Sequence, residues 1–207
     1  MFGSIRIISY NINKNIMANN VYTVVSIEAS KELIKNFADK LFTSEVKEAD
    51  WQKKSDLLAD NLYGLLYKDY PKDNLTRDWM TENVGAKWCF VHDWYLGDNT
   101  IDLTFDSAWY PPEELFHEIA DWFTKRGEFE MEARSEDEAY IHVSGGYANQ
   151  NGSEFICDDE NLPEYPDDED YKDQYDYDEA VEKFYDTIAD RKDDLVLECK
   201  QELMIYP

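Results

Sequence analysis

A short stretch near the middle of the chain alternates strictly between apolar and polar side chains. Between residues 100 and 108, Ile101, Leu103 and Phe105 alternate with polar residues. Because successive residues of a β-strand point to opposite faces of its sheet, the pattern predicts a strand that is buried on one side and wet on the other. Sheets with one solvated face are typically antiparallel. The stretch therefore favours an antiparallel sheet that is covered on one face.

The segments around this strand carry either strand or helix patterns. Some are rich in β-branched and aromatic residues or alternate in the same way, which predicts strands. In others, apolar side chains recur every three to four residues, which predicts helices. The expected strands are 21–28, 88–95, 100–108, 129–133 and 139–144, and the expected helices are 30–42, 51–67 and 111–126.

The order of these elements is strand, helix, extra helix, strand, strand, helix, strand, strand. Without the inserted helix it contains βαββαβ, the ferredoxin-like split unit. We therefore expect an α+β fold, a ferredoxin-like antiparallel sheet with helices on one face, an inserted helix and an acidic C-terminal extension. The expected parts are an N-terminal extension at 1–16, the ferredoxin-like α+β domain at 17–157, and an acidic tyrosine-rich segment with a C-terminal helix at 158–207.

The charge of the chain excludes several classes of partner. It has 46 acidic and 20 basic residues, a formal net charge of −26, and residues 158–194 alone hold 17 acids and four bases. Nucleic-acid binding draws its affinity from Lys and Arg on phosphates, so this surface would be repelled by nucleic acid and by anionic membranes. The expected partner is a basic protein. The 43% hydrophobic content argues against global disorder.

The cysteines and the first residues bear on the compartment. Cys89, Cys157 and Cys199 are widely spaced and lack a CxxC pair, which is typical of reduced thiols in a cytosol. No apolar run approaches the length of a membrane span. Residues 1–16 lack the apolar core and cleavage site of a signal peptide, and Met17 offers an alternative start. We therefore expect a cytoplasmic protein.

Two motifs carry a resemblance to a known family. They read DWMTENVGAKW at residues 78–88 and LTFDSAWYPP at residues 103–112. Together they resemble the YubB-like family of plasmid and phage proteins, which has a ferredoxin-like domain, and the element order agrees over residues 18–145. Val84 departs from the family pattern, which usually has tryptophan before the glycine. The resemblance implies a fold and an origin in a phage or other mobile element, hence a host cytoplasm, and it implies no catalytic mechanism.

Two groups of residues could carry chemistry. His117 and Asp121 form an HExxD pattern on one face of an expected helix and could hold a metal, but no third ligand is apparent and the stretch is an ordinary amphipathic helix. Cys89, His92 and Asp93 share a strand, where alternation places Cys89 and Asp93 on one face and His92 on the other. We therefore predict no catalytic, cofactor-binding or metal-binding residue.

Glycines follow the last expected strand. Gly145 and Gly146 precede Tyr147, and residues 149–152 read NQNG. The spacing is not that of a phosphate-binding loop, and no cation lies near. We therefore expect a flexible turn between strands.

The segment after residue 157 interleaves acids with tyrosines. Runs of like charge are usually solvated linkers, and a calcium site is a second alternative, although the glycine and terminal glutamate of an EF-hand loop are missing. Tyrosine is favoured at protein interfaces, which suggests a binding surface. An apolar stripe at 180–189 predicts a further helix. The predicted partner-binding residues are Asp158, Asp159, Glu160, Asp167, Asp168, Glu169, Asp170, Tyr171, Asp173, Tyr175, Asp176, Tyr177 and Asp178.

Three functions fit these patterns. We favour a non-enzymatic, phage-encoded interaction protein that presents carboxylates to a basic, nucleic-acid-binding host protein, as a DNA mimic or an inhibitor of host defence. The second is a small-molecule-binding or catalytic domain with incidental acidity, which needs a pocket around His117 or His92. The third is a self-associating structural or regulatory module that the acidic segment keeps soluble. No cofactor is predicted for the favoured function.

Overall fold

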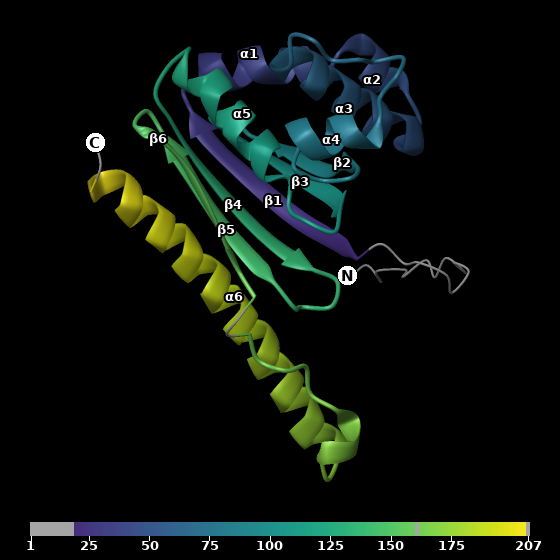
Figure 1. Ribbon diagram of the computed structural model, residues 1–207, viewed down its shortest axis with the longest axis vertical. Helices are drawn as coiled ribbons and strands as arrows, with labels where there is room; N and C mark the ends of the chain where they lie inside the picture. The colour runs from purple at the N-terminus through teal and green to yellow at the C-terminus, as the bar shows by residue number, and fades with distance from the viewer. Residues whose placement is uncertain (1–18, 160–161, 206–207) are drawn as a thin grey trace.

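The computed structural model describes residues 19–159 and 162–205 (Figure 1). The predicted extension at 1–16 and Glu160 lie outside these ranges. The strands are β1 (Asn20–Ala29), β2 (Cys89–Leu96), β3 (Thr100–Ala108), β4 (Phe129–Asp137), β5 (Val143–Asn149) and β6 (Gly152–Asp158). The helices are α1 (Lys31–Leu41), α2 (Ser44–Glu48), α3 (Trp51–Leu66), α4 (Arg77–Asn83), α5 (Glu113–Thr124) and α6 (Gln174–Ile205), with a short 3₁₀ helix η1 (Asp168–Asp170).

The strands form one sheet in the order β2-β3-β1-β4-β5-β6, and every neighbouring pair is antiparallel. The predicted α+β class and antiparallel sheet are therefore confirmed. The order differs from that of a strict ferredoxin-like sheet, because β5 and β6 extend it beyond β4. The predicted strand at 139–144 is replaced by β5, and β6 was not predicted at all.

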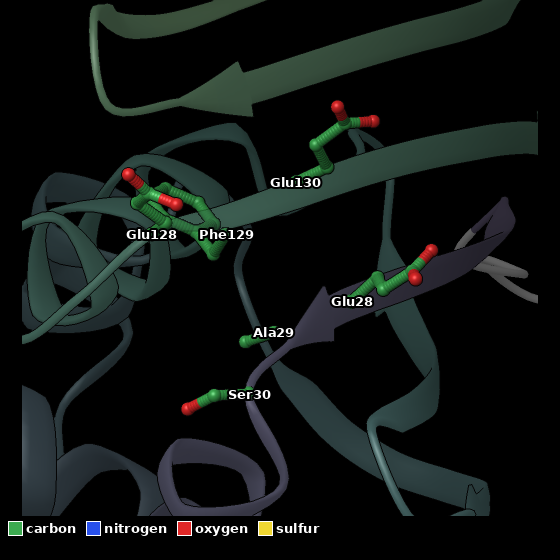
Figure 2. Close-up of a pocket in the computed structure, with 6 residues that line it drawn as sticks. All are labelled: Glu28, Ala29, Ser30, Glu128, Phe129 and Glu130. Atoms are coloured by element: carbon green, nitrogen blue, oxygen red, sulfur yellow. The ribbon is translucent and has the colours of Figure 1, made fainter.

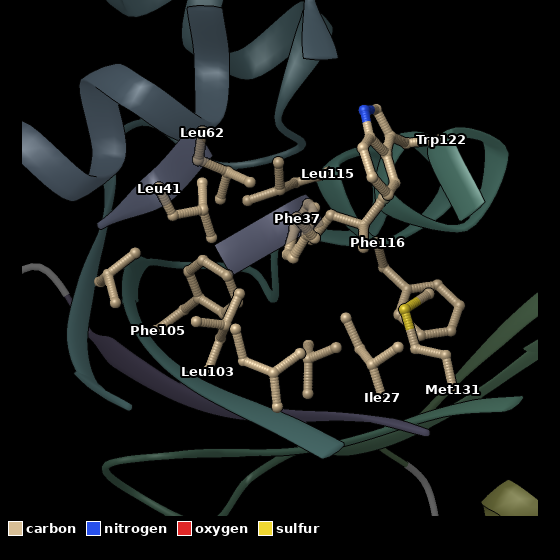
Figure 3. Close-up of a cluster of buried hydrophobic side chains, with 14 of the residues drawn as sticks. Ile27, Phe37, Leu41, Leu62, Leu103, Phe105, Leu115, Phe116, Trp122 and Met131 are labelled. Atoms are coloured by element: carbon tan, nitrogen blue, oxygen red, sulfur yellow. The ribbon is translucent and has the colours of Figure 1, made fainter. Parts of the chain in front are cut away.

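The core lies under one face of this sheet. In β1, Val21, Val25 and Ile27 are at most 1% exposed and point toward the helices, as the alternation of the strand requires. Ser30 begins α1 as a cap, accepting a hydrogen bond from the backbone N–H of Leu33. Figure 3 shows how side chains from α1, α3 and α5 meet those of the sheet. Each fully buried Leu or Phe contributes about 1.5–3 kcal/mol, which sustains a folded body despite the net charge.

The helices lie on both faces of the sheet, so the prediction that they share one face is wrong. Helices α1 to α5 cover one face, and α6 crosses the other face over β4, β5 and β6 (Figure 1). The alternation of β4 shows the two sides: Met131 is buried in the main core, whereas Glu132 points the other way and pairs with Lys200 of α6. Strand β5 points apolar side chains such as Val143 and Tyr147 to the face away from the main core. These side chains pack against α6.

Two glycines make room for α6 and α5 on opposite faces of β5. A Cβ on Gly145 would lie 2.5 Å from Leu195 Cβ of α6. A Cβ on Gly146 would lie 3.1 Å from a ring carbon of Phe116 of α5 and 2.6 Å from one of Phe155 on the neighbouring strand β6. Gln150 and Asn151 do form a turn between strands, β5 and β6, as predicted. The prediction of a flexible turn at Gly145 and Gly146 is wrong. They lie inside a strand, because only glycine permits such close packing there.

A bulge also changes one predicted side-chain direction. The register of β2 against β3 shifts between Val91 and Asp93. Cys89 points into the core, but the shift sets Asp93 opposite Thr104, on the outward side. Cys89 and Asp93 do not share a face, contrary to the prediction from simple alternation.

Candidate protein-interaction surface

The N-terminal half of α6 extends past the end of the sheet, and the chain after β6 runs back beside it (Figure 1). We call residues 162–190, which comprise this segment, η1 and the first half of the helix, the acidic arm. The arm contains 12 acidic and two basic residues, a net charge of −10. It includes most of the residues predicted to bind a partner.

Two of the predicted acids have a structural role. Asp173 begins α6, and its Oδ1 accepts hydrogen bonds from the backbone N–H groups of Tyr175 (3.0 Å) and Asp176 (3.1 Å). Asp167 accepts from the N–H of Glu169 (3.1 Å) at the start of η1. Carboxylates at helix N-termini are stabilised by the free N–H groups and by the helix dipole. One oxygen of each carboxylate is therefore used to fold the arm, although both residues are exposed.

Aromatic rings hold the arm in shape. The ring of Phe184 in α6 packs against two tyrosine rings. Its centroid lies 5.1 Å from that of Tyr165 and 5.4 Å from that of Tyr140, which is in the turn between β4 and β5. Tyr171 and Tyr177 pack against each other at 5.8 Å. Such edge-on pairs contribute about 0.5–1.5 kcal/mol each beyond the buried area. The tyrosines thus fix the carboxylates in place, and much of their surface is used within the chain.

The remaining predicted residues divide by exposure. Asp158 ends β6, is 8% exposed and pairs with Arg191 at 2.6 Å, so it does not belong to the outer surface. Tyr175 is 75% exposed. The other predicted acids that the structure describes are exposed: Asp159, Asp168, Glu169, Asp170, Asp176 and Asp178.

The histidines with candidate chemistry lie on separate surfaces. His117 Nδ1 lies 2.7 Å from Ser153 Oγ of β6, while Asp121 pairs with Lys125, so the HExxD residues do not converge. His92 Nδ1 lies 2.9 Å from Asp106 Oδ2 on the outward face of the sheet. Burial raises the pKa of the Asp106 carboxyl above its usual value, and His92 opposes that effect only in part.

The buried thiols are poor nucleophiles. Burial raises the pKa of Cys89 to about 12 and that of Cys199 to about 11. Since the thiolate is the reactive form, neither side chain is activated at neutral pH. All three cysteines are free of disulfides.

One shallow hollow lies at the end of β1 and is acidic, lined by Glu28, Ser30, Glu128 and Glu130 among others (Figure 2). Within residues 19–159 and 162–205, no three His, Cys, Asp or Glu side chains are placed to hold a metal ion. In the same ranges no helix is long and apolar enough to cross a membrane.

One surface was not predicted. Tyr22 and Val24 project from β1 on the side away from the main core and are 41% and 42% exposed, although β1 lies between β3 and β4 in the sheet. The sequence gives only a weak indication of this surface, because apolar side chains occupy both sets of alternate positions in residues 21–28. That pattern is compatible with two covered faces as well as with one.

Comparisons with protein families, with curated proteins and with solved structures gave no match to this chain. The resemblance to the YubB-like family rests on the two sequence motifs alone.

Proposed function

We propose that this chain is a non-enzymatic interaction protein whose acidic arm binds a basic, nucleic-acid-binding protein. The observation that supports the proposal is the concentration of carboxylates on a helix that projects beyond the sheet (Figure 1). Cations and basic surfaces are the partners that such a field attracts.

The charge density of the arm bears on whether it stands in for DNA. The helical part of the arm, residues 174–190, is about 25 Å long at about 1.5 Å per residue. This helical part has six acids and one base, a net charge of −5 or one charge per roughly 5 Å, compared with one per about 1.7 Å of a DNA duplex. Residues 162–173, which run beside the helix, add a further −5 and bring the arm closer to the density of a nucleic-acid backbone, which supports mimicry.

The base of the arm is firmly held. Further along α6, Leu195 and Val196 are buried against β5 and β6, and Lys192 pairs with Glu136 of β4. An array that is already ordered loses less conformational entropy when it binds. Rigidity favours a binding surface over a solubilising linker as the role of these residues.

The test compares two variants with equal loss of charge. In the arm variant, Asp168→Asn, Glu169→Gln, Asp170→Asn and Asp176→Asn remove four exposed carboxylates that do not cap the arm. In the control variant, Glu32→Gln, Glu45→Gln, Glu48→Gln and Asp56→Asn do the same on α1, α2 and α3.

Each protein is immobilised and exposed to bacterial lysate at physiological salt, and the captured proteins are identified by mass spectrometry. We expect the wild type and the control variant to enrich a nucleic-acid-binding protein and the arm variant to lose it. Enrichment of no such protein, or equal enrichment by all three, would refute the proposal.

We further propose that β1 to β4, with α1 and α5, form a ferredoxin-like core to which β5, β6 and α6 are added. The order β2-β3-β1-β4, antiparallel throughout, with helices after β1 and β3, supports this assignment. A phage or plasmid origin and a place in the host cytoplasm are part of the same proposal, supported by the two motifs and by the free thiols.

A further inference from the structure

The face of the sheet that carries α6 is only half covered. Helix α6 contacts β4, β5 and β6, whereas none of the helices within residues 19–159 and 162–205 lies over the outward side chains of β1, β2 and β3 (Figure 1). We call the outward side chains of these three strands, together with Glu130 of β4, the open half-face. A central strand with exposed Tyr22 and Val24 is unusual, because apolar side chains in the middle of a sheet are ordinarily packed.

One end of the open half-face is aromatic. The register sets Tyr22 of β1 opposite Asp106 of β3, and Asp106 opposite Phe90 of β2, so these side chains form a row across three strands. The ring of Trp88 stacks on Phe90 with centroids 5.4 Å apart and planes 17° apart. Val24 is the next outward residue of β1. Phe90 is half-buried and packs in part against the main core, so Tyr22 and Val24 provide most of the exposed apolar contact area at this end.

The other end is acidic. Glu28 of β1 lies directly opposite Glu130 of β4, and Ser26 lies between Asp102 and Glu132 on the neighbouring strands (Figure 2 shows Glu28 and Glu130). Glu132 pairs with Lys200 and with Arg134 of its own strand, and Lys200 also feels the charge of Glu130. In the part of the chain that the structure describes, Glu28, Asp102 and Glu130 form no salt bridge of their own. Like charges that face each other across strands destabilise a sheet, and a cation from outside would relieve them.

The dimensions suit one helix. Four strands about 4.8 Å apart make a surface about 14 Å wide, and strands of eight to ten residues make it about 27 Å long. An α-helix with its side chains is about 10 Å across. The neighbouring half of the same face already holds a helix, α6, in this manner.

We infer that the open half-face binds one basic amphipathic helix of a partner protein, lying beside α6. Its apolar side chains contact Tyr22, Val24 and Phe90, and its Lys or Arg side chains reach Glu28 and Glu130. A second copy of this chain, with its net charge of −26, does not suit such a site, and nucleic acid is repelled for the same reason. The inference rests on the proposed function for the basic nature of the partner, but it assigns a surface other than the acidic arm.

The test uses an 18-residue peptide of Leu and Lys, with Leu at helical spacing, and a Leu/Glu peptide of the same pattern as its control. Binding is measured by titration calorimetry and mapped by amide chemical shifts. We expect the Leu/Lys peptide to shift amides of β1 and β3. Glu28→Lys should weaken its binding about tenfold, because a close charge pair is replaced by repulsion. The same change should raise the thermal midpoint of unfolding, since the introduced ammonium group would then face the carboxylate of Glu130. A purely structural role for Glu28 does not predict weaker peptide binding together with higher stability.

Glu179→Lys on the arm is the matched control, since it changes the net charge equally on an exposed helix position. Equal weakening by Glu28→Lys and Glu179→Lys, or equal binding of the Leu/Glu peptide, would overturn the inference. Shifts confined to the arm would overturn it too, while leaving the proposed function intact. Failure of the Leu/Lys peptide to bind either surface would count against both.

Discussion

At the scale of single residues, Gly145 determines where the last helix can lie. Its missing side chain lets the backbone of α6 reach β5, since a Cβ there would lie 2.6 Å from Val196 N. Gly64, inside α3, is different: the nearest atom to a Cβ at that position is 3.8 Å away. The two glycines therefore respond to substitution in opposite directions.

We predict that Gly145→Ala destabilises the protein by about 1–3 kcal/mol, as overpacking does. Gly64→Ala should stabilise it by about 0.5–1 kcal/mol, because alanine is the better helix former. Urea unfolding of both variants measures the changes. A neutral Gly145→Ala would show that α6 does not pack closely on β5.

The three thiols should differ in reactivity. Cys89 and Cys199 are buried, whereas Cys157 is exposed on β6. Partial burial also raises the pKa of the Cys157 thiol, and a hydrogen bond from Ser144 opposes that effect, so the difference between the thiols is one of access. We predict that one thiol per chain reacts quickly with an aromatic disulfide reagent at pH 8 and that all three react after unfolding. Cys157→Ser should abolish the fast phase. Rapid reaction of two or three thiols in the native protein would contradict this burial.

At the scale of elements, α6 is fixed by ion pairs as well as by apolar packing. Glu132 of β4 lies 2.5 Å from Lys200 and 2.9 Å from Arg134. Burial acts to raise the pKa of Glu132, but hydrogen bonds from these two cations outweigh it and hold the pKa below its usual value. A carboxyl with a lowered native pKa stabilises the fold above its unfolded pKa, and this contribution is lost as the pH falls through the native pKa.

Glu132→Gln should therefore lower the free energy of unfolding by about 1 kcal/mol at pH 7. The difference from wild type should shrink as the pH falls below about 4.5 and vanish once Glu132 is protonated in the native state. Chemical denaturation at several pH values measures it, with Glu48→Gln on α2 as an exposed control. A difference that is independent of pH would contradict the electrostatic account of this contact.

The sequence allowed some elements to be predicted and not others. α1, β3 and α5 have clear periods, and they lie where those periods place them, while β1 was predicted from its β-branched and aromatic residues. β5 was missed because the reason for its glycines lies 50 residues away in α6. Of the candidate surface, the acidity and its place in the chain were predictable. The pairing of Asp158 with Arg191, the capping role of Asp173 and the open half-face depend on tertiary contacts that no local pattern contains.

At the scale of the whole molecule, a net charge of −26 acts against compactness. We predict that the thermal midpoint rises when NaCl increases from 10 mM to 0.5 M, because the screening length falls from about 30 Å to under 10 Å. The surface ion pairs weaken over the same range, but each contributes little. A midpoint that falls with salt would show that these pairs outweigh the general repulsion.

The account depends most on the claim that the acidic arm competes with nucleic acid for a basic protein. The direct measurement is the release of a labelled DNA duplex from the captured partner as wild-type protein, the arm variant or the control variant is added. We predict that wild type and control displace the duplex at similar concentrations, and that the variant lacking Asp168, Glu169, Asp170 and Asp176 requires at least about tenfold more, because close charge pairs at such an interface are lost. Equal displacement by all three proteins, or no displacement by the wild type, would contradict the account.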